Sequence, residues 1–280
     1  MNQKFGNTSR GNISRALTSV IASTALMISL VGCDDGIFDS TDDSGTFRVI
    51  LHDAPGDFQE VNVDIQRVEV NKEEDEDSGW TTISEPDQVY DLLELINGVQ
   101  EVLGEEELEA GTYRQIRLIL GDENTVVIDD ESHDMMVPSG QQTGIKLNID
   151  AEIESGIEYN LLLDFDAKRS VVRRGQGDFL LKPVIKATNE AITGNVAGTI
   201  EPEEARPWIY AIAGDDTLST TRSEEGTGEF RLIGLEEGTY DISFEPVDGY
   251  QSKIEEDVEV EIGETTDLGT VEIDEDSNDE

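Results

Sequence analysis

The chain of 280 residues has one cysteine, Cys33, and two histidines, His52 and His133. A single thiol cannot form an intrachain disulfide, and zinc sites lose the cysteine and histidine ligands that they usually require. Nucleophilic catalysis also lacks candidates, because the sequence contains no Gly-x-Ser-x-Gly motif. We therefore predict that the protein is not an enzyme and holds no cofactor, apart from a calcium ion considered below.

Basic residues are scarce as well. Lys and Arg total 19 against 64 Asp and Glu, which gives a formal net charge of −45 at pH 7. Such a chain repels phosphate backbones, so nucleic acid is disfavoured as a partner. Self-repulsion of the carboxylates is tolerable in a saline habitat, where the Debye length falls to about 3 Å near 1 M salt, and we predict a halophilic, acidic protein.

The excess of acid does not predict disorder. Hydrophobic residues make up 36% of the chain, and its 26 glycines bring the apolar share close to that of ordinary globular proteins. Acidic and apolar residues alternate in segments such as 61–65 and 258–262, a period that puts carboxylates on the solvent face of a strand. The charge is therefore expected to coat folded sheets.

The N-terminus has the pattern of an export signal. Lys4, Arg10 and Arg15 precede an apolar run over residues 16–30, and no acidic residue interrupts them. Fifteen residues are few for spanning a hydrocarbon core of about 30 Å, so a transmembrane anchor is the weaker interpretation. The sequence Leu30-Val31-Gly32-Cys33 resembles a bacterial lipobox. This resemblance implies a signal peptide over 1–32, acylation of Cys33 and anchoring in the cell envelope, which we expect to be at the outer membrane, facing the periplasm or the surface; the alternative is a signal peptide with an incidental cysteine.

The remaining sequence predicts an all-β protein: two antiparallel β-sandwich domains in tandem, the first with a short helical insertion. We place an acidic flexible tether at 33–45, the first sandwich at 46–188, the second at 189–273 and an acidic tail at 274–280. The strands expected in the first sandwich cover 47–51, 61–70, 113–120, 125–128, 145–149, 159–165 and 179–187. Those expected in the second cover 192–200, 208–213, 228–232, 238–244, 255–262 and 268–273. Apolar spacing over 91–103 predicts the short helix or two turns.

A short echo links the two halves. Residues 108–113 read Leu-Glu-Ala-Gly-Thr-Tyr, and residues 235–240 read Leu-Glu-Glu-Gly-Thr-Tyr. We expect each glycine to permit a tight turn, and each tyrosine to start a strand with its ring in the core and its hydroxyl reaching the backbone. Two sandwiches of related build would explain the echo.

Several motifs carry family resemblances. The first sandwich resembles the lipoprotein family called domain of unknown function 4382, through residues 53–56, Trp80, 91–93, 110–118, 138–140, 164–167 and 181–184. The resemblance implies no known activity. The second sandwich is similar to carboxypeptidase-regulatory-like or Cna-B-type modules, through residues 194–200, 228–235 and 238–240. That similarity implies a carbohydrate-binding-like fold used as a spacer; because Lys253 is the only lysine after Lys186, we expect no isopeptide crosslink.

One acidic group is a calcium candidate. Asp164 and Asp166 lie two apart in a predicted strand, so their carboxylates point the same way, about 6.6 Å apart along the strand. Asp53 and Asp57 could add the oxygens that Ca²⁺ requires. The favoured alternative is that Asp166 caps a turn while Asp164 pairs with a neighbouring arginine, since the chain has no EF-hand or aspartate-rich calcium repeat.

A basic cluster stands out against the acid. Lys168, Arg169, Arg173 and Arg174, with Lys182 and Lys186 nearby, flank a predicted hairpin loop at 175–177. One interpretation is a patch that binds an anionic glycan or partner. The favoured alternative is neutralisation of carboxylates in the same sheet.

These patterns together predict a lipid-anchored envelope protein with a non-catalytic binding or structural role, in which the second domain is a spacer or stabiliser. The expected partners are the membrane, through the acyl anchor, and glycans or envelope proteins. A carbohydrate-binding surface lipoprotein is the main alternative; Trp80, Trp208, Tyr210 and Tyr250 are the aromatic candidates, although core packing is the favoured role of each. A calcium-dependent adhesin and a carboxylate-based glycosidase are less favoured, the latter because two acids suffice for that reaction.

Overall fold

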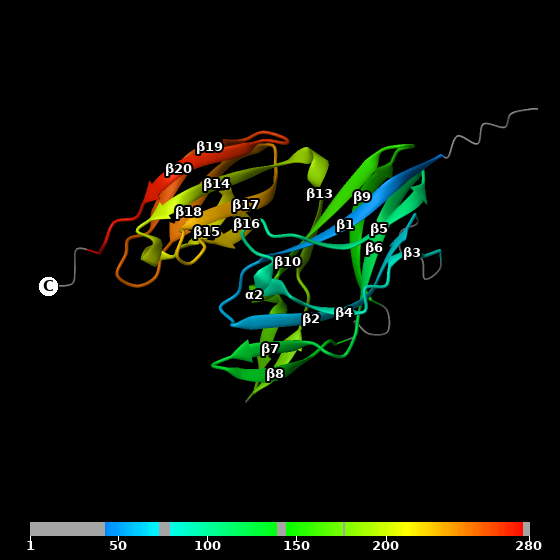
Figure 1. Cartoon of the computed structure of the whole chain (residues 1–280), viewed down its shortest axis with the longest axis horizontal. Coiled ribbons are helices and arrows are strands. Elements are labelled where there is room, and N and C mark those ends of the chain that lie inside the picture. Colours follow the sequence, from blue (N-terminus) through cyan, green and yellow to red (C-terminus); the bar gives the residue numbers. More distant parts are fainter. Residues whose placement is uncertain (1–42, 73–78, 139–143, 176, 277–280) are drawn as a thin grey trace, which may run out of the picture. The chain divides into compact units, whose positions relative to one another are not determined.

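The computed structural model describes residues 43–72, 79–138, 144–175 and 177–276 (Figure 1). Residues 40–280 form one compact unit. The predicted signal peptide, Cys33, nearly all of the tether and the last four residues of the acidic tail lie outside the described residues. No described helix is long and apolar enough to cross a membrane.

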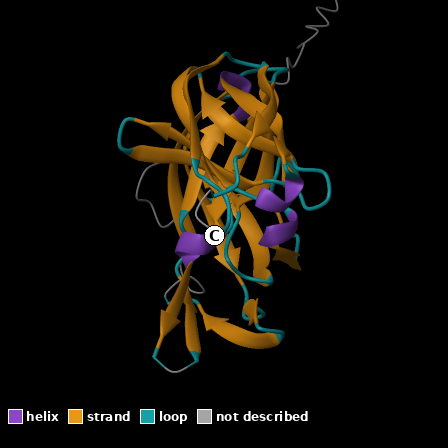
Figure 2. Cartoon of the chain, turned by 90° about the vertical axis from the view of Figure 1, so that its left-hand side faces the viewer, coloured by secondary structure: helices purple, strands orange, loops and turns teal. Residues whose placement is uncertain are grey.

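Strands dominate the described chain, and the few helical turns are short (Figure 2). The strands of the first sandwich are β1 (Ser44–Ala54), β2 (Glu60–Asn71), β3 (Thr81–Ser84), β4 (Gln88–Asp91), β5 (Glu101–Glu109), β6 (Gly111–Leu120), β7 (Thr125–Ile128), β8 (Glu131–Met136), β9 (Ile145–Ile153), β10 (Glu158–Asp166), β11 (Val171–Arg174), β12 (Asp178–Leu181) and β13 (Ile185–Asn189). Its helical turns are η1 (Leu92–Glu94) and α2 (Ala167–Ser170). The all-β prediction is confirmed.

The first sandwich packs a four-stranded sheet, in the order β13-β10-β1-β5, against a nine-stranded sheet built around β2. Alternate residues of β1, including Phe47, Val49 and Leu51, are fully buried between the two sheets. The facing side chains come from β2 and β6, and Phe165 adds a second large ring from β10. Each such side chain contributes roughly 1.5–3 kcal/mol through burial, so this apolar layer holds the two sheets together.

The second sandwich has two smaller sheets, in the orders β17-β14-β20 and β16-β15-β18-β19. Its strands are β14 (Thr193–Glu201), β15 (Trp208–Ala213), β16 (Asp216–Arg222), β17 (Glu229–Glu236), β18 (Gly238–Glu245), β19 (Lys253–Val260) and β20 (Thr265–Glu272), with the turns η2 (Glu190–Ile192) and η3 (Glu203–Ala205). Phe230 and Phe244 meet edge to face at its centre, with ring centroids 5.6 Å apart. A separate core therefore holds this sandwich together.

Three strand pairs depart from the antiparallel pattern. β1 runs parallel to β10, β14 to β20, and β12 to β8, whereas the other pairs between named strands are antiparallel. The expected strand over 179–187 is divided in the structure. Pro183 separates β12 from β13, which join different sheets, because proline cannot donate to a ladder.

The helical insertion is smaller than the apolar spacing predicted. Only η1 forms there; Asp91 caps it by accepting the Leu93 N–H at 3.1 Å. Leu103, expected on the helix, instead lies in β5, and Val99 is half exposed. β5 escaped prediction because it is an edge strand rich in glutamate, with only two buried side chains. β3, β4, β8 and β16 were also not predicted.

The two sandwiches share a common plan. Five strands of the first sandwich have counterparts of the same order and pairing in the second: β1, β5, β6, β9 and β10 correspond to β14, β17, β18, β19 and β20. β1 and β14 each have a parallel neighbour, β10 or β20, and an antiparallel one, β5 or β17, and β6 pairs with β9 as β18 does with β19. The turn before each parallel strand is held in the same way: the Gly156 N–H donates to the Ser44 carbonyl at 2.8 Å, and the Gly263 N–H to the Thr193 carbonyl at 2.9 Å. The related build inferred from the sequence echo is therefore present in the fold.

Both tyrosines of the echo behave as expected. The rings of Tyr113 and Tyr240 are buried, and their hydroxyls donate to the carbonyls of Glu109 at 3.2 Å and Glu236 at 2.8 Å. The glycines differ, however. Gly111 has a φ of +138°, which favours glycine, whereas Gly238 is outside the positive-φ set and a Cβ there would make only ordinary contacts.

Candidate functional site

A row of polar side chains crosses the four-stranded sheet at the end of β1. His52 on β1 lies opposite Asp164 on β10, and Asp164 lies opposite Lys186 on β13. Because β1 residues alternate between faces, His52 shares the face of Ile50 and not that of the buried Leu51. Ile50, Leu162 and Ile233 of β17 form a small apolar cluster on this face. The polar row therefore lies beside the contact between the two sandwiches.

Burial shifts the pKa values of His52 and Asp164 in this row. Burial, followed by the positive charge of Lys186, lowers the pKa of His52 to about 4. Burial also raises the pKa of Asp164 to about 7, although Lys186 opposes that rise. The His52 Nε2 and the Asp164 Oδ1 are 3.8 Å apart. At neutral pH the histidine is thus uncharged, and Asp164 is close to its titration midpoint.

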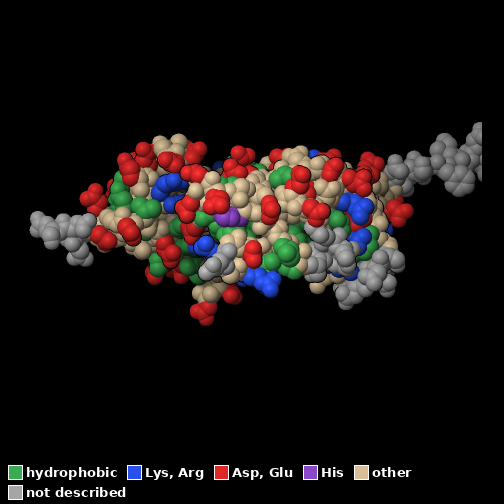
Figure 3. Space-filling model, turned by 90° about the horizontal axis from the view of Figure 1, so that it is seen from below, with side chains coloured by type: hydrophobic (Ala, Val, Ile, Leu, Met, Phe, Trp, Pro, Cys, Tyr) green, Lys and Arg blue, Asp and Glu red, His purple; other side chains and the backbone are tan. Residues whose placement is uncertain are grey.

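A cavity of about 340 Å³ opens next to this row. One wall comes from the ends of β1, β10 and β13 and from α2, and the other from β15 and β16 of the second sandwich. Its lining residues are Ala54, Pro55, Asp164, Asp166, Lys168, Arg169, Val184, Lys186, Tyr210, Thr217, Leu218, Ser219 and Thr220. We call this space the junction cavity. Three basic side chains gather in it, although acidic side chains cover much of the surface visible in Figure 3.

The four calcium candidates have separate roles. Asp164 and Asp166 both line the junction cavity, so the prediction that they share a face is confirmed. Asp166 caps α2 by accepting the Arg169 N–H at 2.8 Å, as the turn-capping alternative predicted. Asp57 is largely exposed and pairs with the Lys168 Nζ at 3.5 Å. The basic neighbour of Asp164 is Lys186 and not an arginine.

Asp53 stabilises the fold behind the cavity. It is 2% exposed, and its Oδ1 accepts the Ala167 N–H at 2.9 Å, which ties the start of α2 to β1. Burial raises the pKa of this carboxyl well above its usual range. Within the described ranges, no group of three or more His, Asp or Glu side chains is placed to hold a metal ion. The aspartates therefore do not converge as a calcium site requires.

The structure divides the predicted basic cluster. Lys168 and Arg169 lie on α2 at the junction cavity, together with Lys186. Arg173 and Arg174 lie on β11, which forms the expected hairpin with β12. The Arg173 guanidinium lies 5.7 Å from the centre of the Phe179 ring. Lys168 and Arg169 thus line the cavity, whereas Arg173 and Arg174 belong to the hairpin.

A family model described as "Domain of unknown function (DUF4382)" matches residues 44–183, which is half of the chain. The chain belongs to the DUF4382 family. The matched region covers β1 to β12, and it includes the ends of β1 and β10 and the whole of α2. Lys186 and the β15 and β16 wall of the cavity lie beyond the matched residues. The DUF4382 region therefore supplies most of one wall of the junction cavity and four of its five charged side chains, Asp164, Asp166, Lys168 and Arg169.

Solved structures give only weak similarity. The Bacillus anthracis TIE protein is 14% identical with a TM-score of 0.22; the match covers 83% of this chain and 34% of that one. The minor pilin GBS52 of Streptococcus agalactiae is 12% identical with a TM-score of 0.23, over 82% and 96%. A fimbrial protein from Bacteroides ovatus is 10% identical with a TM-score of 0.19, over 82% and 50%. The chain thus spans about a third of the TIE protein. No curated protein matches it.

The aromatic candidates divide between the DUF4382 region and the second sandwich. Trp80 lies under the Arg117 guanidinium, 4.1 Å from the ring centre. Trp208 lies near two cations, Lys168 at 4.6 Å and Arg222 at 5.1 Å. Tyr250 packs against the core of the second sandwich. Tyr210 is the member of this group that lines the junction cavity.

Sequence reasoning missed the residue that joins the DUF4382 region to β17. Asn97, at a φ of +59°, donates through Nδ2 to the Glu229 carbonyl at 3.3 Å and accepts the Arg231 N–H through Oδ1. Its side chain therefore pairs with the edge of β17 as a neighbouring strand would. The Asn97-Gly98 dipeptide was the available signal, because such pairs mark turns with positive φ.

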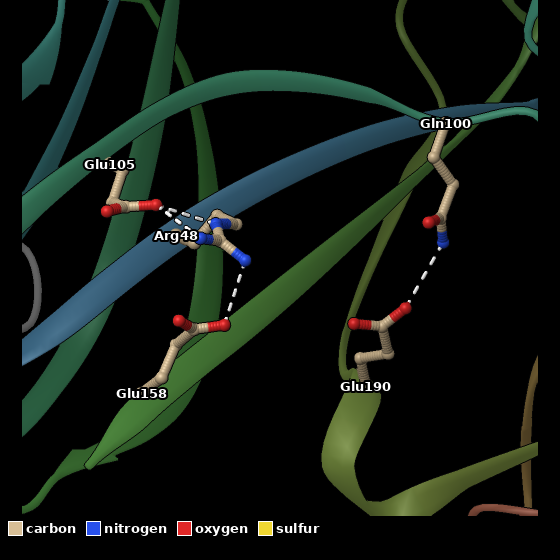
Figure 4. A network of polar contacts seen from close by, with 5 residues as sticks. All are labelled: Arg48, Gln100, Glu105, Glu158 and Glu190. Atoms are coloured by element: carbon tan, nitrogen blue, oxygen red, sulfur yellow. Dashed lines mark hydrogen bonds and ion pairs between the residues drawn. The ribbon is translucent and has the colours of Figure 1, made fainter.

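A second polar contact reaches η2, where the chain leaves β13. Figure 4 shows Gln100 pointing toward Glu190, with a hydrogen bond of 3.2 Å from Nε2 to Oε1. In the same view Arg48 lies between Glu105 and Glu158, with ion pairs of 2.6 and 2.8 Å. Glu105 and Glu158 lie on β5 and β10, the strands that flank β1. These ion pairs thus link three strands of the four-stranded sheet, on the face that the polar row occupies.

Proposed function

We propose that this DUF4382 protein is a lipid-anchored component of the cell envelope with a non-catalytic binding role. The observation that carries the binding role is the junction cavity, whose walls come from both sandwiches and whose lining mixes cations, carboxylates and hydroxyls. Ligand sites are concave, with a few convergent polar groups, and they favour the boundaries between domains. In this proposal the second sandwich stabilises the first and completes its site.

The anchor is proposed from the sequence. The charged leader, the short apolar run and Cys33 support export and acylation. In cells fed radiolabelled palmitate, we expect the native chain to carry label and to sediment with outer membranes. Cys33→Ser is expected to abolish labelling and release the protein from the membrane fraction. Membrane retention without label would refute the lipid anchor, and protease treatment of intact cells would report the leaflet.

The stabilising role of the second sandwich has a direct support. Ile233 packs on Ile50 and Leu162, which are nearly fully buried in the intact chain. Removing residues 190–280 would expose this apolar pair and the neighbouring His52 to water. We expect the shortened chain to unfold at a lower temperature than the native one. Equal melting temperatures would reduce the second sandwich to a spacer, which we infer to be of the carboxypeptidase-regulatory-like type.

A carbohydrate-binding lipoprotein is the candidate that the cavity favours among the binding roles. Tyr210, Thr217 and Thr220 place hydroxyl-bearing side chains on the wall opposite the charged one. Sugar hydroxyls both donate and accept, so they match a lining that contains carboxylates, hydroxyls and cations. Binding of the soluble 40–280 chain to a glycan array tests this role, and flat signals across diverse polysaccharides would favour a protein partner instead.

A further inference from the structure

Two basic side chains in the junction cavity, Lys186 and Arg169, have few interactions with the rest of the described chain. Within the described ranges, Lys186 makes no ion pair or hydrogen bond, although it lies opposite Asp164 in the sheet register. Arg169 has only a long contact, 3.8 Å from its Nε to the Asp166 Oδ2, and its side chain is 72% exposed. Lys168, by contrast, is held by Asp57 and by the Trp208 ring. Lys186 and Arg169 can therefore receive an anionic group.

The same cavity also has an acceptor without a donor. The Asp164 Oδ1 is buried and accepts no hydrogen bond from the described part of the chain. Buried acceptors are normally satisfied, and an unsatisfied carboxylate oxygen in a concave site favours a ligand that donates. Thr217 and Tyr210 line the opposite wall. The Thr217 hydroxyl can donate or accept, whereas the Tyr210 hydroxyl is already hydrogen-bonded to Glu245 and is left as an acceptor.

This combination restricts the ligand. A simple anion would gain from Lys186 and Arg169 but would meet Asp164 and Asp166 without any donor to offer them. A simple cation would meet the carboxylates but be repelled by three basic side chains. A neutral sugar would leave the two cations without a partner. The matching ligand carries one negative charge and several hydroxyl groups.

We propose that the junction cavity binds a sugar acid, such as a hexuronate unit of a glycan. Its carboxylate lies between Lys186 and Arg169, where charge-assisted hydrogen bonds are strongest. Its ring hydroxyls donate to Asp164 and contact the Thr217 and Tyr210 side. A cavity of about 340 Å³ is at the lower end of the range for small-molecule sites, which suits one sugar residue. This inference rests on the proposed binding role and names its ligand class.

The test uses residues 40–280, the compact unit that holds both cores and all the described elements. Titration calorimetry compares sodium galacturonate and oligogalacturonate with galactose, glycine and inorganic phosphate. We expect the two acids to bind and the other three probes to bind at least about tenfold more weakly. The double variant R169A/K186A is expected to lose at least about tenfold in affinity for galacturonate.

A matched control removes the same charge elsewhere. R173A/R174A deletes two cations of the β11 hairpin, outside the cavity lining, and is expected to keep the affinity for galacturonate. Thr217→Val is expected to weaken galacturonate binding, because it removes a wall hydroxyl with little change in shape. Circular dichroism melting of every variant separates lost binding from lost folding.

Three outcomes would overturn the inference. If galactose binds as tightly as galacturonate, the basic side chains do not contribute to ligand affinity. If glycine binds and galacturonate does not, the ligand is a zwitterion and not a sugar acid. An equal loss of affinity in the hairpin control would place the site elsewhere. The anchor is tested separately, because palmitate labelling of Cys33 does not depend on the ligand. Release of reducing ends from oligogalacturonate would refute the non-catalytic role while leaving the ligand class in place.

Discussion

Tyr113 and Tyr240 hold equivalent positions in the two sandwiches: each hydroxyl donates to the backbone carbonyl four residues before it. Both follow the glycine that joins the two sheets of a sandwich, and both rings are buried. A register shift follows each tyrosine in its pairing with the next strand, β9 or β19. The same corner thus fixes the crossing between sheets in both halves of the chain.

Replacing either corner tyrosine by phenylalanine is expected to destabilise the protein by about 1 kcal/mol. The substitution keeps the ring in the core and removes one hydrogen bond to a partly buried carbonyl. Urea unfolding of Tyr113→Phe and Tyr240→Phe measures the change. Tyr250→Phe is the control, because no described group bonds its hydroxyl; a loss there as large as at the corners would contradict the assignment.

Gly194→Ala is expected to destabilise the second sandwich by about 1–3 kcal/mol. A Cβ at this position would overlap the carbonyl oxygen of Glu261 in the turn before β20, and backbone cannot move aside cheaply. Gly45 meets the carbonyl of Glu154 in the same way in the first sandwich. Thermal melting compares Gly194→Ala with Gly238→Ala, whose added methyl would touch only the Tyr240 ring; equal effects would rule out the close-approach explanation.

Asn97→Gly is expected to loosen the contact with β17 without straining the loop. Glycine accepts the φ of +59°, so the substitution isolates the loss of two hydrogen bonds, each about 0.5–1.5 kcal/mol. Amide hydrogen exchange at Arg231 should accelerate, since the Asn97 Oδ1 accepts that N–H. Asn97→Asp keeps the acceptor and should preserve more of the protection. Unchanged exchange at Arg231 in Asn97→Gly would show that the contact is absent in solution.

Opposite pH dependences are expected for His52 and Asp164. The pKa of His52 is about 4 in the fold and about 6.5 when unfolded, so its contribution to stability is lost as pH falls from 6.5 toward 4. Asp164, at about 7 in the fold against about 3.9 unfolded, contributes stability below pH 4 that is lost as pH rises through 7. The two effects oppose one another between about pH 4 and 6.5.

Single substitutions should expose each effect. Relative to the native chain, Asp164→Asn should lose stability more steeply on acidification from pH 6.5 to 4, by up to about 1.4 kcal/mol per pH unit. His52→Gln should lose it less steeply over the same interval. Denaturant unfolding at several pH values gives the slopes. Parallel slopes in the native chain and both variants would show that neither group titrates differently on folding.

Local pattern was enough to predict most of the fold. Period-two alternation located β2, β6 and β10, and the repeated Gly-Thr-Tyr predicted both tyrosine corners, because a strand's buried face and a tight turn are encoded by neighbouring residues. β5 was missed because an edge strand buries little, and its glutamates resemble a loop. The parallel pairing of β1 with β10 was also beyond reach, since it joins residues more than a hundred positions apart.

For the candidate site, too, the features that depend on neighbouring residues were predictable and those that depend on long-range packing were not. Local sequence pattern predicted that Asp164 and Asp166 share a face and that basic residues cluster near 168–174, and it offered the Asp166 turn cap as the favoured alternative. All three depend on short separations along the chain. The placement of Lys186, Arg169 and Tyr210 around one cavity, with Arg173 outside its lining, emerges from the folded arrangement alone. Arg173 is separated from the cavity by the order of the strands and by the packing of the second sandwich on Ile50 and Leu162. Both depend on the burial of apolar side chains far apart in the sequence, so no local pattern could predict them.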